Sequence, residues 1–130
     1  MNRKIRILIV DDSVSFRMGM RALLEIQPDM QEVGMAPNGH KALELIEELQ
    51  PDLVLLDAQM PDINGIEVTQ KIKSRWPNVK VILMTMFSDF RTKAIEAGAD
   101  TFLTKGIPPE HVLSLIRGIV QIEKKSINKE

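Results

Sequence analysis

The chain has 130 residues, and with 44% hydrophobic and 27% charged residues it has the composition of one globular domain rather than of a disordered segment. Its formal net charge of -1 gives no overall positive field, so we expect neither direct nucleic-acid binding nor attachment to a membrane surface. The absence of cysteine excludes disulfides, thiolate catalysis and cysteine-based zinc sites.

The first part of the chain predicts a strand, a helix and a second strand. The apolar run Ile5–Val10 is typical of a strand buried on both faces. It is too short for a signal-peptide core or a membrane span, which favours a cytoplasmic protein. Ser13 can cap a helix that runs to about Gln27, and Gln31–Ala36 is a weaker strand candidate. The apolar face of this helix holds Phe16, Met20, Leu23 and Leu24.

The middle of the chain repeats the same alternation. Asn38 can cap a second helix, which Pro51 closes, and a buried strand is expected at Leu53–Leu56. A third helix is expected from Ile66 to about Trp76, before a proline. The inward face of the second helix holds Ala42, Leu45, Ile46 and Leu49.

The last third of the chain predicts a buried strand at Val79–Met84, a short helix over Ser88–Ala97 and a weak strand at Thr101–Leu103. Gly98 suits the position just after the short helix, and Pro109 suits the first turn of a fifth helix. The inward face of that fifth helix holds Val112, Leu115, Ile116 and Ile119.

Alternating strands and helices with short links predict an α/β fold with a doubly wound parallel sheet and right-handed crossovers. We expect one domain over residues 1–122. The polar stretch 123–130 is expected to be the end of the fifth helix or the start of a linker.

Polar residues lie where four of the predicted strands end. Asp11 and Asp12 follow the first strand, Asp57 follows the third, Thr85 follows the fourth, and Lys105 comes just after the fifth. Each residue alone has an ordinary structural explanation, such as a turn, a helix cap or a solvated loop. In a doubly wound sheet, however, these strand ends form the ligand-binding edge, so we expect the five side chains to converge there.

This set of side chains has a consistent chemistry. Three neighbouring carboxylates repel one another and favour a hard divalent cation, and a site without an enclosing cage favours Mg²⁺ with bound water over Ca²⁺. Asp57 could then attack a phosphoryl group, with Lys105 neutralising the charge on the phosphoryl oxygens and Thr85 donating a hydrogen bond to one of them. The expected product is an acyl phosphate on Asp57.

At these positions the sequence resembles the receiver domains of bacterial two-component response regulators. The resemblance runs from about Ile5 to Ile122 and rests on the segments ILIVDDS, LVLLDAQMPDINGIE, VILMTMF and GADTFLTKGIPP. The segments FRMGMRALLE and GADTFLTK are similar to receivers of the NarL/FixJ type. The resemblance implies a flavodoxin-like sheet of order 2-1-3-4-5. It also implies a signalling switch that catalyses only its own phosphorylation and dephosphorylation, rather than an enzyme.

The resemblance also implies roles for single residues. Asp57 resembles the phospho-acceptor, Asp12 the direct Mg²⁺ ligand, and Asp11 the acid that acts mostly through water. The backbone carbonyl of Gln59 resembles a further metal ligand, and Lys105 resembles the lysine that pairs with the phosphate. Mn²⁺ is expected to substitute for Mg²⁺. The implied phosphoryl donor is a histidine kinase or a histidine phosphotransfer protein, and small acyl phosphates can often replace it.

The expected readout is a change in the surface formed by the fourth helix, the fifth strand and the fifth helix, which could support a homodimer or bind a target. Thr85 and Phe102 resemble the switch pair, in which the hydroxyl moves toward the phosphate and the ring turns inward. The segment between Thr85 and Gly98 is about two residues shorter than the family pattern, which leaves its response open. Met86 and Phe87 are bulky residues that, with Gln59, can limit access of water and donor to the site; an ordinary variable position is the alternative for Gln59.

Three other functions stay open at this point. The chain could be the isolated receiver of a helix-turn-helix transcription regulator, or a degenerate receiver that acts as a scaffold. It could also be a haloacid-dehalogenase-like phosphohydrolase, but that class has its two acids two positions apart after the first strand, whereas Asp11 and Asp12 are adjacent.

Overall fold

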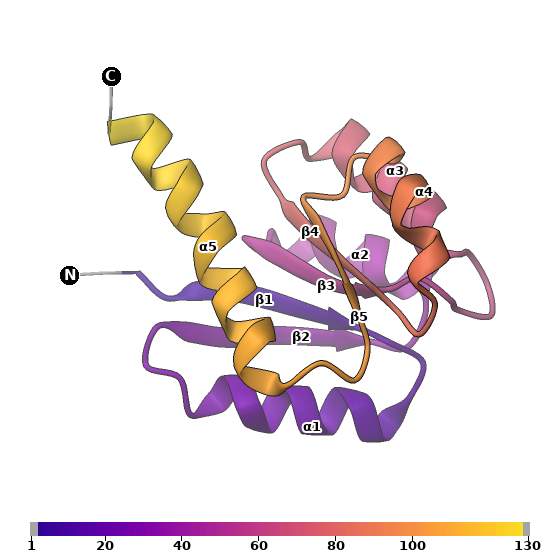
Figure 1. Cartoon of the computed structure of the whole chain (residues 1–130), viewed down its shortest axis with the longest axis horizontal. Helices are drawn as coiled ribbons and strands as arrows, with labels where there is room; N and C mark the ends of the chain where they lie inside the picture. Colours follow the sequence, from indigo (N-terminus) through magenta and orange to yellow (C-terminus); the bar gives the residue numbers. More distant parts are fainter. Residues whose placement is uncertain (1–2, 129–130) are drawn as a thin grey trace.

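The computed structural model describes residues 3–128 and contains one five-stranded sheet in the order β2-β1-β3-β4-β5 (Figure 1). All neighbouring strands run parallel. Strands and helices alternate along the chain, so every strand returns to the sheet through a helical crossover. The predicted doubly wound α/β fold and its strand order are confirmed.

The strands are β1 (Ile5–Val10), β2 (Met30–Ala36), β3 (Leu53–Asp57), β4 (Lys80–Thr85) and β5 (Thr101–Thr104). The prediction for β1 is confirmed at both ends. The predicted range Val79–Met84 was wrong by one residue at each end. Val79 belongs to the turn after the third helix, where its N–H donates to the Trp76 carbonyl at 3.0 Å, and Thr85 still pairs with Thr104 on β5.

The helices are α1 (Val14–Glu25), α2 (Gly39–Leu49), α3 (Gly65–Arg75), α4 (Arg91–Glu96) and α5 (Pro109–Asn128). Ser13 and Asn38 cap α1 and α2 as predicted, because their side chains accept hydrogen bonds from the first helical turn. The predicted start of α3 at Ile66 was one residue late. Asn64 caps this helix and accepts a hydrogen bond from the Glu67 N–H at 2.9 Å.

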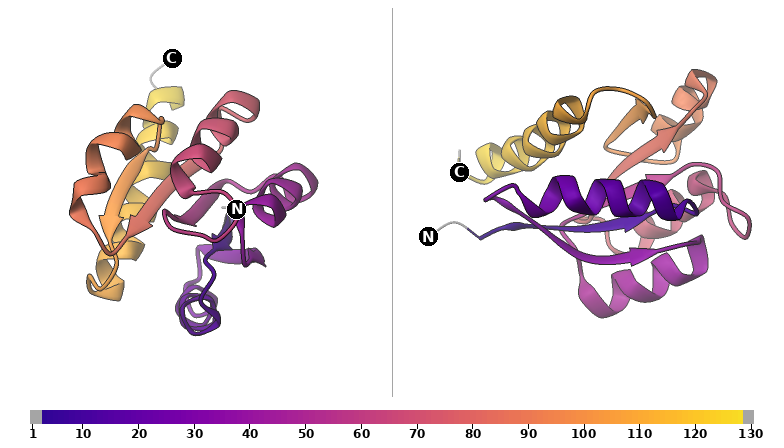
Figure 2. Two further views of the ribbon diagram at one scale, coloured as in Figure 1. Left: turned by 90° about the vertical axis from the view of Figure 1, so that its right-hand side faces the viewer. Right: turned by 90° about the horizontal axis from the view of Figure 1, so that it is seen from below.

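Helices cover both faces of the sheet, as Figure 2 shows from two further sides. Alternate residues of a strand point to opposite faces, and β1 shows this directly. Ile7 and Ile9 pack in a core with residues of α1 and α5, whereas Leu8 and Val10 pack in a second core with residues of α2, α3 and α4. Burial on both faces explains why the central strands are apolar at nearly every position.

The segment after β4 differs from the predicted single helix over Ser88–Ala97. It begins with a 3-10 turn, η1 (Ser88–Phe90), and only then continues as the six-residue helix α4. Gly98 ends it with a φ of +98°, a conformation that favours glycine, so its predicted role after the helix is confirmed. The shortness of the segment therefore leaves α4 with less than two turns.

Within residues 3–128, no helix is both long and apolar enough to cross a membrane. α5 continues through Asn128, and residues 129–130 of the predicted helix end or linker lie outside the described residues. The domain boundary at residue 122 stays a prediction.

Candidate functional site

The candidate site is built from the carboxyl ends of four neighbouring strands. Asp11 and Asp12 follow β1 directly, Asp57 is the last residue of β3, and Thr85 is the last residue of β4. Lys105 follows β5, and its backbone N–H donates to the Thr85 carbonyl at 2.6 Å. The order β1-β3-β4-β5 makes these four strands consecutive neighbours, so residues distant in sequence reach one edge of the sheet.

Three carboxylates gather at this edge. One oxygen each from Asp11, Asp12 and Asp57 can be chosen so that all lie within 4.8 Å of one another. Asp11 and Asp57 are buried, whereas Asp12 is exposed. We call Asp11, Asp12 and Asp57 the acid cluster. Such a group of anions is repulsive unless a cation lies beside it.

Lys105 supplies one positive charge to the acid cluster. Its Nζ atom lies 2.6 Å from Oδ2 of Asp11 and 3.5 Å from Oδ2 of Asp57. Burial alone would lower the pKa of Lys105, but its contacts with these two carboxylates hold that pKa above its usual value. The ammonium therefore stays charged at neutral pH, and the site contains a fixed cation.

The carboxyl group of Asp57 is a weaker acid than an ordinary aspartate side chain. Burial raises its pKa to about 6, and the negative charge of Asp11 acts in the same direction. The Gln59 N–H, which donates to Oδ1 of Asp57 at 3.1 Å, and the ammonium of Lys105 oppose this rise. Asp57 is thus held as a desolvated carboxylate near neutral pH, a state that suits a nucleophile or a metal ligand.

The residues present fit a hard divalent cation. Oδ2 of Asp11 is fully buried, and apart from its ion pair with Lys105 it has no hydrogen bond of normal geometry among the described residues. The donor set consists of carboxylate oxygens, which Mg²⁺ prefers, and the exposure of Asp12 leaves room for bound water. The backbone carbonyl of Gln59 stays a predicted ligand.

The start of α3 lies against the end of β3. A Cβ atom on Gly65 would lie 2.4 Å from the Asp57 carbonyl oxygen and 2.6 Å from the Cα atom of Ala58, closer than real Cβ contacts. The Gly65 N–H donates to the Ala58 carbonyl at 2.8 Å. Glycine is therefore required here, because only its missing side chain lets the helix approach the backbone that carries Asp57.

The Thr85 hydroxyl is held by two neighbours. It accepts a hydrogen bond from the Phe87 N–H at 3.1 Å and lies 3.4 Å from the side-chain oxygen of Gln59, a long and weak contact. Phe102, the predicted partner of Thr85, is half-buried and packs against the core on the α2–α3–α4 side of the sheet. Met86 and Phe87 are both more than half exposed, at 62% and 55%.

Two residues of α1 also reach the site, although the sequence pattern did not predict this role for them. The ring of Phe16 lies under the Lys105 ammonium, with 4.7 Å between the ring centroid and Nζ. The Arg17 guanidinium donates to the backbone carbonyl of Asp11 at 2.6 Å. Their sequence positions could have indicated this role. Both residues lie in the first turn of α1 after the Ser13 cap, and that turn begins at the edge of the sheet where the acid cluster lies.

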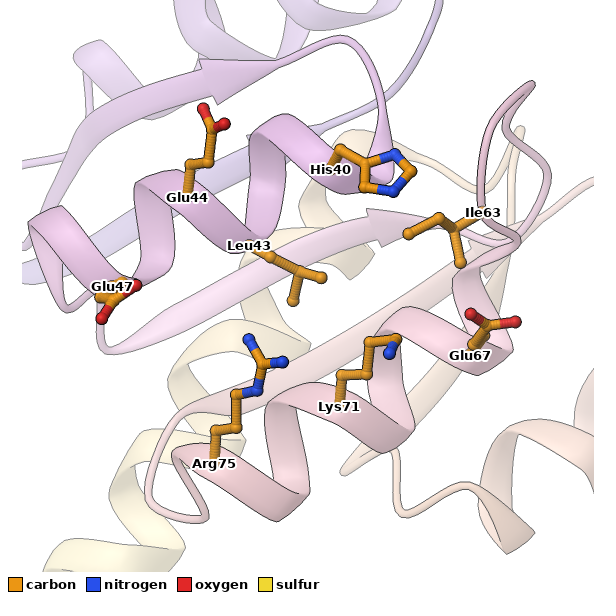
Figure 3. Close-up of a pocket in the computed structure, with 8 residues that line it drawn as sticks. All are labelled: His40, Leu43, Glu44, Glu47, Ile63, Glu67, Lys71 and Arg75. Atoms are coloured by element: carbon orange, nitrogen blue, oxygen red, sulfur yellow. The ribbon is translucent and has the colours of Figure 1, made fainter.

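A groove between α2 and α3 is separate from this site (Figure 3). Glu44 and Glu47 line it from α2, and Lys71 and Arg75 line it from α3. None of the predicted site residues lines this groove.

Comparisons with known proteins agree with this geometry. A family model described as the response regulator receiver domain matches residues 7–117. Among curated proteins, the chain is 32% identical over 120 residues to the transcriptional regulatory protein DegU of Brevibacillus brevis, covering 91% of this chain and 51% of that protein. It is 38% identical over 117 residues to the response regulator GacA of Pseudomonas aeruginosa, covering 88% and 55%. The chain thus spans about half the length of these relatives.

Solved structures show the same likeness. A LuxR-family two-component response regulator from Aurantimonas is 34% identical with a TM-score of 0.86, covering 91% of this chain and 86% of that one. The signal receiver domain of the putative response regulator NarL from Mycobacterium tuberculosis is 29% identical, also with a TM-score of 0.86, covering 92% and 98%.

Proposed function

This chain belongs to the response regulator receiver family, and we propose that it works as a phospho-accepting switch that takes a phosphoryl group on Asp57. The observation that supports this proposal is the position of Asp57, a buried carboxylate with both the Lys105 ammonium and two further acids beside it. The receiver family serves signalling, so the proposed chemistry is limited to the chain's own phosphorylation and dephosphorylation.

In the proposed step, one carboxylate oxygen of Asp57 forms a bond to phosphorus. The bond between phosphorus and the donor atom breaks, and its electron pair leaves with the donor. Lys105 balances negative charge on the phosphoryl oxygens, because its Nζ atom is already 3.5 Å from Asp57 Oδ2. The Thr85 hydroxyl then leaves its weak contact with Gln59 and donates to a phosphoryl oxygen.

The acid cluster would hold Mg²⁺, with Asp12 and Asp57 as ligands, Asp11 acting mostly through water, and the Gln59 carbonyl as a further ligand. When bound, the ion supplies charge neutralisation for the phosphoryl oxygens. Mn²⁺ accepts similar oxygen ligands, so we propose that it substitutes.

We propose a histidine kinase or a histidine phosphotransfer protein as the donor, as for the family. Movement of Thr85 and Phe102 would change the α4–β5–α5 surface, which could then form a homodimer or bind a target.

Since DegU carries the name of a transcriptional regulatory protein, control of transcription is the proposed outcome for the protein in the cell. A scaffold function without phosphorylation is the alternative, and the complete acid cluster speaks against it.

The test is intact mass after incubation with Mg²⁺ and acetyl phosphate. We expect one phosphoryl adduct in the wild type, none without a divalent ion, and none in Asp57→Asn. Asp89→Asn is the matched control, because this exposed carboxylate lies in η1 outside the acid cluster and should leave the adduct intact. An unmodified wild type that also fails to respond to beryllofluoride would favour the scaffold function.

A further inference from the structure

The Lys105 side chain is held by three neighbours. Two are the carboxylates of Asp11 and Asp57, at 2.6 Å and 3.5 Å from Nζ. The third is the ring of Phe16, whose centroid lies 4.7 Å from the same atom. Only 16% of the Lys105 side chain is exposed, so little water remains to solvate the ammonium. The ring of Phe16 thus contacts the Lys105 ammonium where the two carboxylates do not.

Phe16 is well anchored for this contact. Its N–H donates to the Ser13 side chain at 3.2 Å in the cap of α1, and its ring packs against the core on the α1–α5 side of the sheet. Lys105, in contrast, lies beside Gly106, which has a φ of +97° in the loop after β5. A loop positions a side chain less precisely than a helix or strand does, and a ring fixed on α1 restricts where the Lys105 ammonium can lie.

An aromatic face differs from a carboxylate in a way that suits a moving cation. A ring attracts an ammonium through its quadrupole over a broad area, without a hydrogen-bond angle to maintain. It also brings no formal charge that would compete with a phosphoryl group. Nζ could therefore shift from Asp11 toward a group on Asp57 while keeping its contact with Phe16.

We propose that Phe16 is a positioning residue for Lys105: its ring holds the ammonium beside Asp11 and Asp57 through a cation–π contact. This inference rests on the proposed function for the role of Lys105. Plain hydrophobic packing is the competing explanation, since the ring also contacts the core. The two explanations differ in one respect, because packing depends on the size of the ring whereas the cation–π contact depends on its electron density.

The test changes the electron density of the ring at position 16 and leaves the size of the ring almost unchanged. Phe16 is replaced by mono-, di- and trifluorinated phenylalanine, and the rate of phosphorylation by acetyl phosphate with Mg²⁺ is measured. We expect the rate to fall stepwise with each fluorine, by about two- to tenfold over the series. The same series in the Lys105→Gln background is the control, and its rates should stay level because the cation is gone.

A second measurement does not depend on phosphorylation. In metal-free protein with ¹³C-labelled lysine, the Cε protons of Lys105, assigned by the signal lost in Lys105→Arg, should be shifted upfield by the ring. Phe16→Leu should abolish this shift, and Phe16→Tyr should keep both the shift and most of the rate. Denaturation curves show whether each variant is folded.

The outcomes separate the two proposals. A level rate across the fluorine series in a wild-type background that is phosphorylated, or a Lys105 signal without the upfield shift, overturns the role of Phe16. A wild type that takes no phosphoryl group overturns the proposed function instead. In that case only the upfield shift of the Lys105 Cε protons tests the contact between Phe16 and Lys105. Loss of the shift in Phe16→Leu and its retention in Phe16→Tyr would support the contact.

Discussion

The ammonium of Lys105 is paired more closely with Asp11, at 2.6 Å, than with any other carboxylate described. Its distance to the proposed phosphoryl acceptor, Asp57, is 3.5 Å. Lys105 therefore offsets part of the negative charge of the acid cluster in this state, and phosphorylation would draw it from Asp11 toward Asp57.

Removing the Lys105 charge should raise the pKa of Asp57. Burial already raises that pKa to about 6, and Lys105 opposes the rise. In metal-free Lys105→Met, carboxyl ¹³C NMR should therefore show Asp57 titrating at higher pH than in the wild type. Lys73→Met is the control, since Lys73 pairs with Asp100 at 2.8 Å instead. An Asp57 pKa that stays level or falls would show that Lys105 does not act on this carboxylate.

The same raised pKa has a consequence for stability. Burial raises the pKa of Asp57 to about 6 in the folded protein, whereas an aspartate in the unfolded chain has a pKa of about 3.8. Its contribution to folding is therefore complete below about pH 4 and is lost as pH rises through 6. Over this pH window, the free energy of unfolding of the metal-free wild type should fall by up to about 3 kcal/mol relative to that of Asp57→Asn. Urea denaturation at several pH values measures this, and parallel curves for the two proteins would contradict it.

Asp62 should stabilise the start of α2 with the opposite pH dependence. Its carboxylate accepts hydrogen bonds from the N–H groups of Gly39 and His40, at 3.0 Å and 2.9 Å, and lies 2.7 Å from the His40 ring. Burial alone would raise the pKa of Asp62, but these hydrogen bonds lower it overall. Its stabilisation is therefore present above the unfolded pKa and is lost as pH falls below about 4.

We expect Asp62→Ala to lower the free energy of unfolding by about 1 kcal/mol at pH 7. The difference from the wild type should shrink in acid, which denaturation at pH 7 and pH 3 would reveal. A difference that grows in acid would mean that the carboxylate is not the stabilising form.

Gly65→Ala should be strongly destabilising. The new Cβ atom would lie 2.4 Å from the Asp57 carbonyl oxygen, so α3 or the end of β3 has to move. We expect a loss of more than about 2 kcal/mol in unfolding free energy, together with weaker phosphorylation. Gly19→Ala is the matched control: nothing lies within 4 Å of its new Cβ atom, and in the middle of α1 it should stabilise by about 0.5–1 kcal/mol. Equal effects at the two positions would contradict the close contact.

Met86→Ala should speed loss of the phosphoryl group. Met86 follows Thr85 directly and is 62% exposed rather than buried in the core, and we expect its side chain to cover part of the site once Asp57 is phosphorylated. A smaller residue would admit water more readily. The decay of the adduct, followed by mass, should be faster in Met86→Ala than in the wild type and unchanged in Met18→Ala, an exposed methionine on α1. Equal decay rates would show that Met86 does not limit access.

Much of this arrangement could be predicted from the sequence because it follows from hydrophobic pattern and strand ends. Runs such as Leu53–Leu56 are apolar at every position only when both faces are covered, and a parallel sheet then brings Asp11, Asp57 and Lys105 to one edge. The break between η1 and α4 could not be predicted, since periodicity does not distinguish a 3-10 turn from the start of an α-helix.

The contacts of single side chains were also beyond the sequence. Phe16 has the spacing of a core residue on α1, and nothing in that pattern shows that Lys105, 89 positions later, lies over its ring. The acidity of Asp57 likewise depends on burial and on neighbours that only the folded chain brings together.

Asp57 is the residue that we expect to carry the phosphoryl group. Borohydride reduces an aspartyl phosphate to homoserine, so the direct measurement is borohydride treatment of the protein after incubation with acetyl phosphate and Mg²⁺, followed by peptide mass spectrometry. We predict homoserine at position 57 and aspartate at positions 11 and 12. Unreduced aspartate at position 57, or homoserine at another position, would contradict the account.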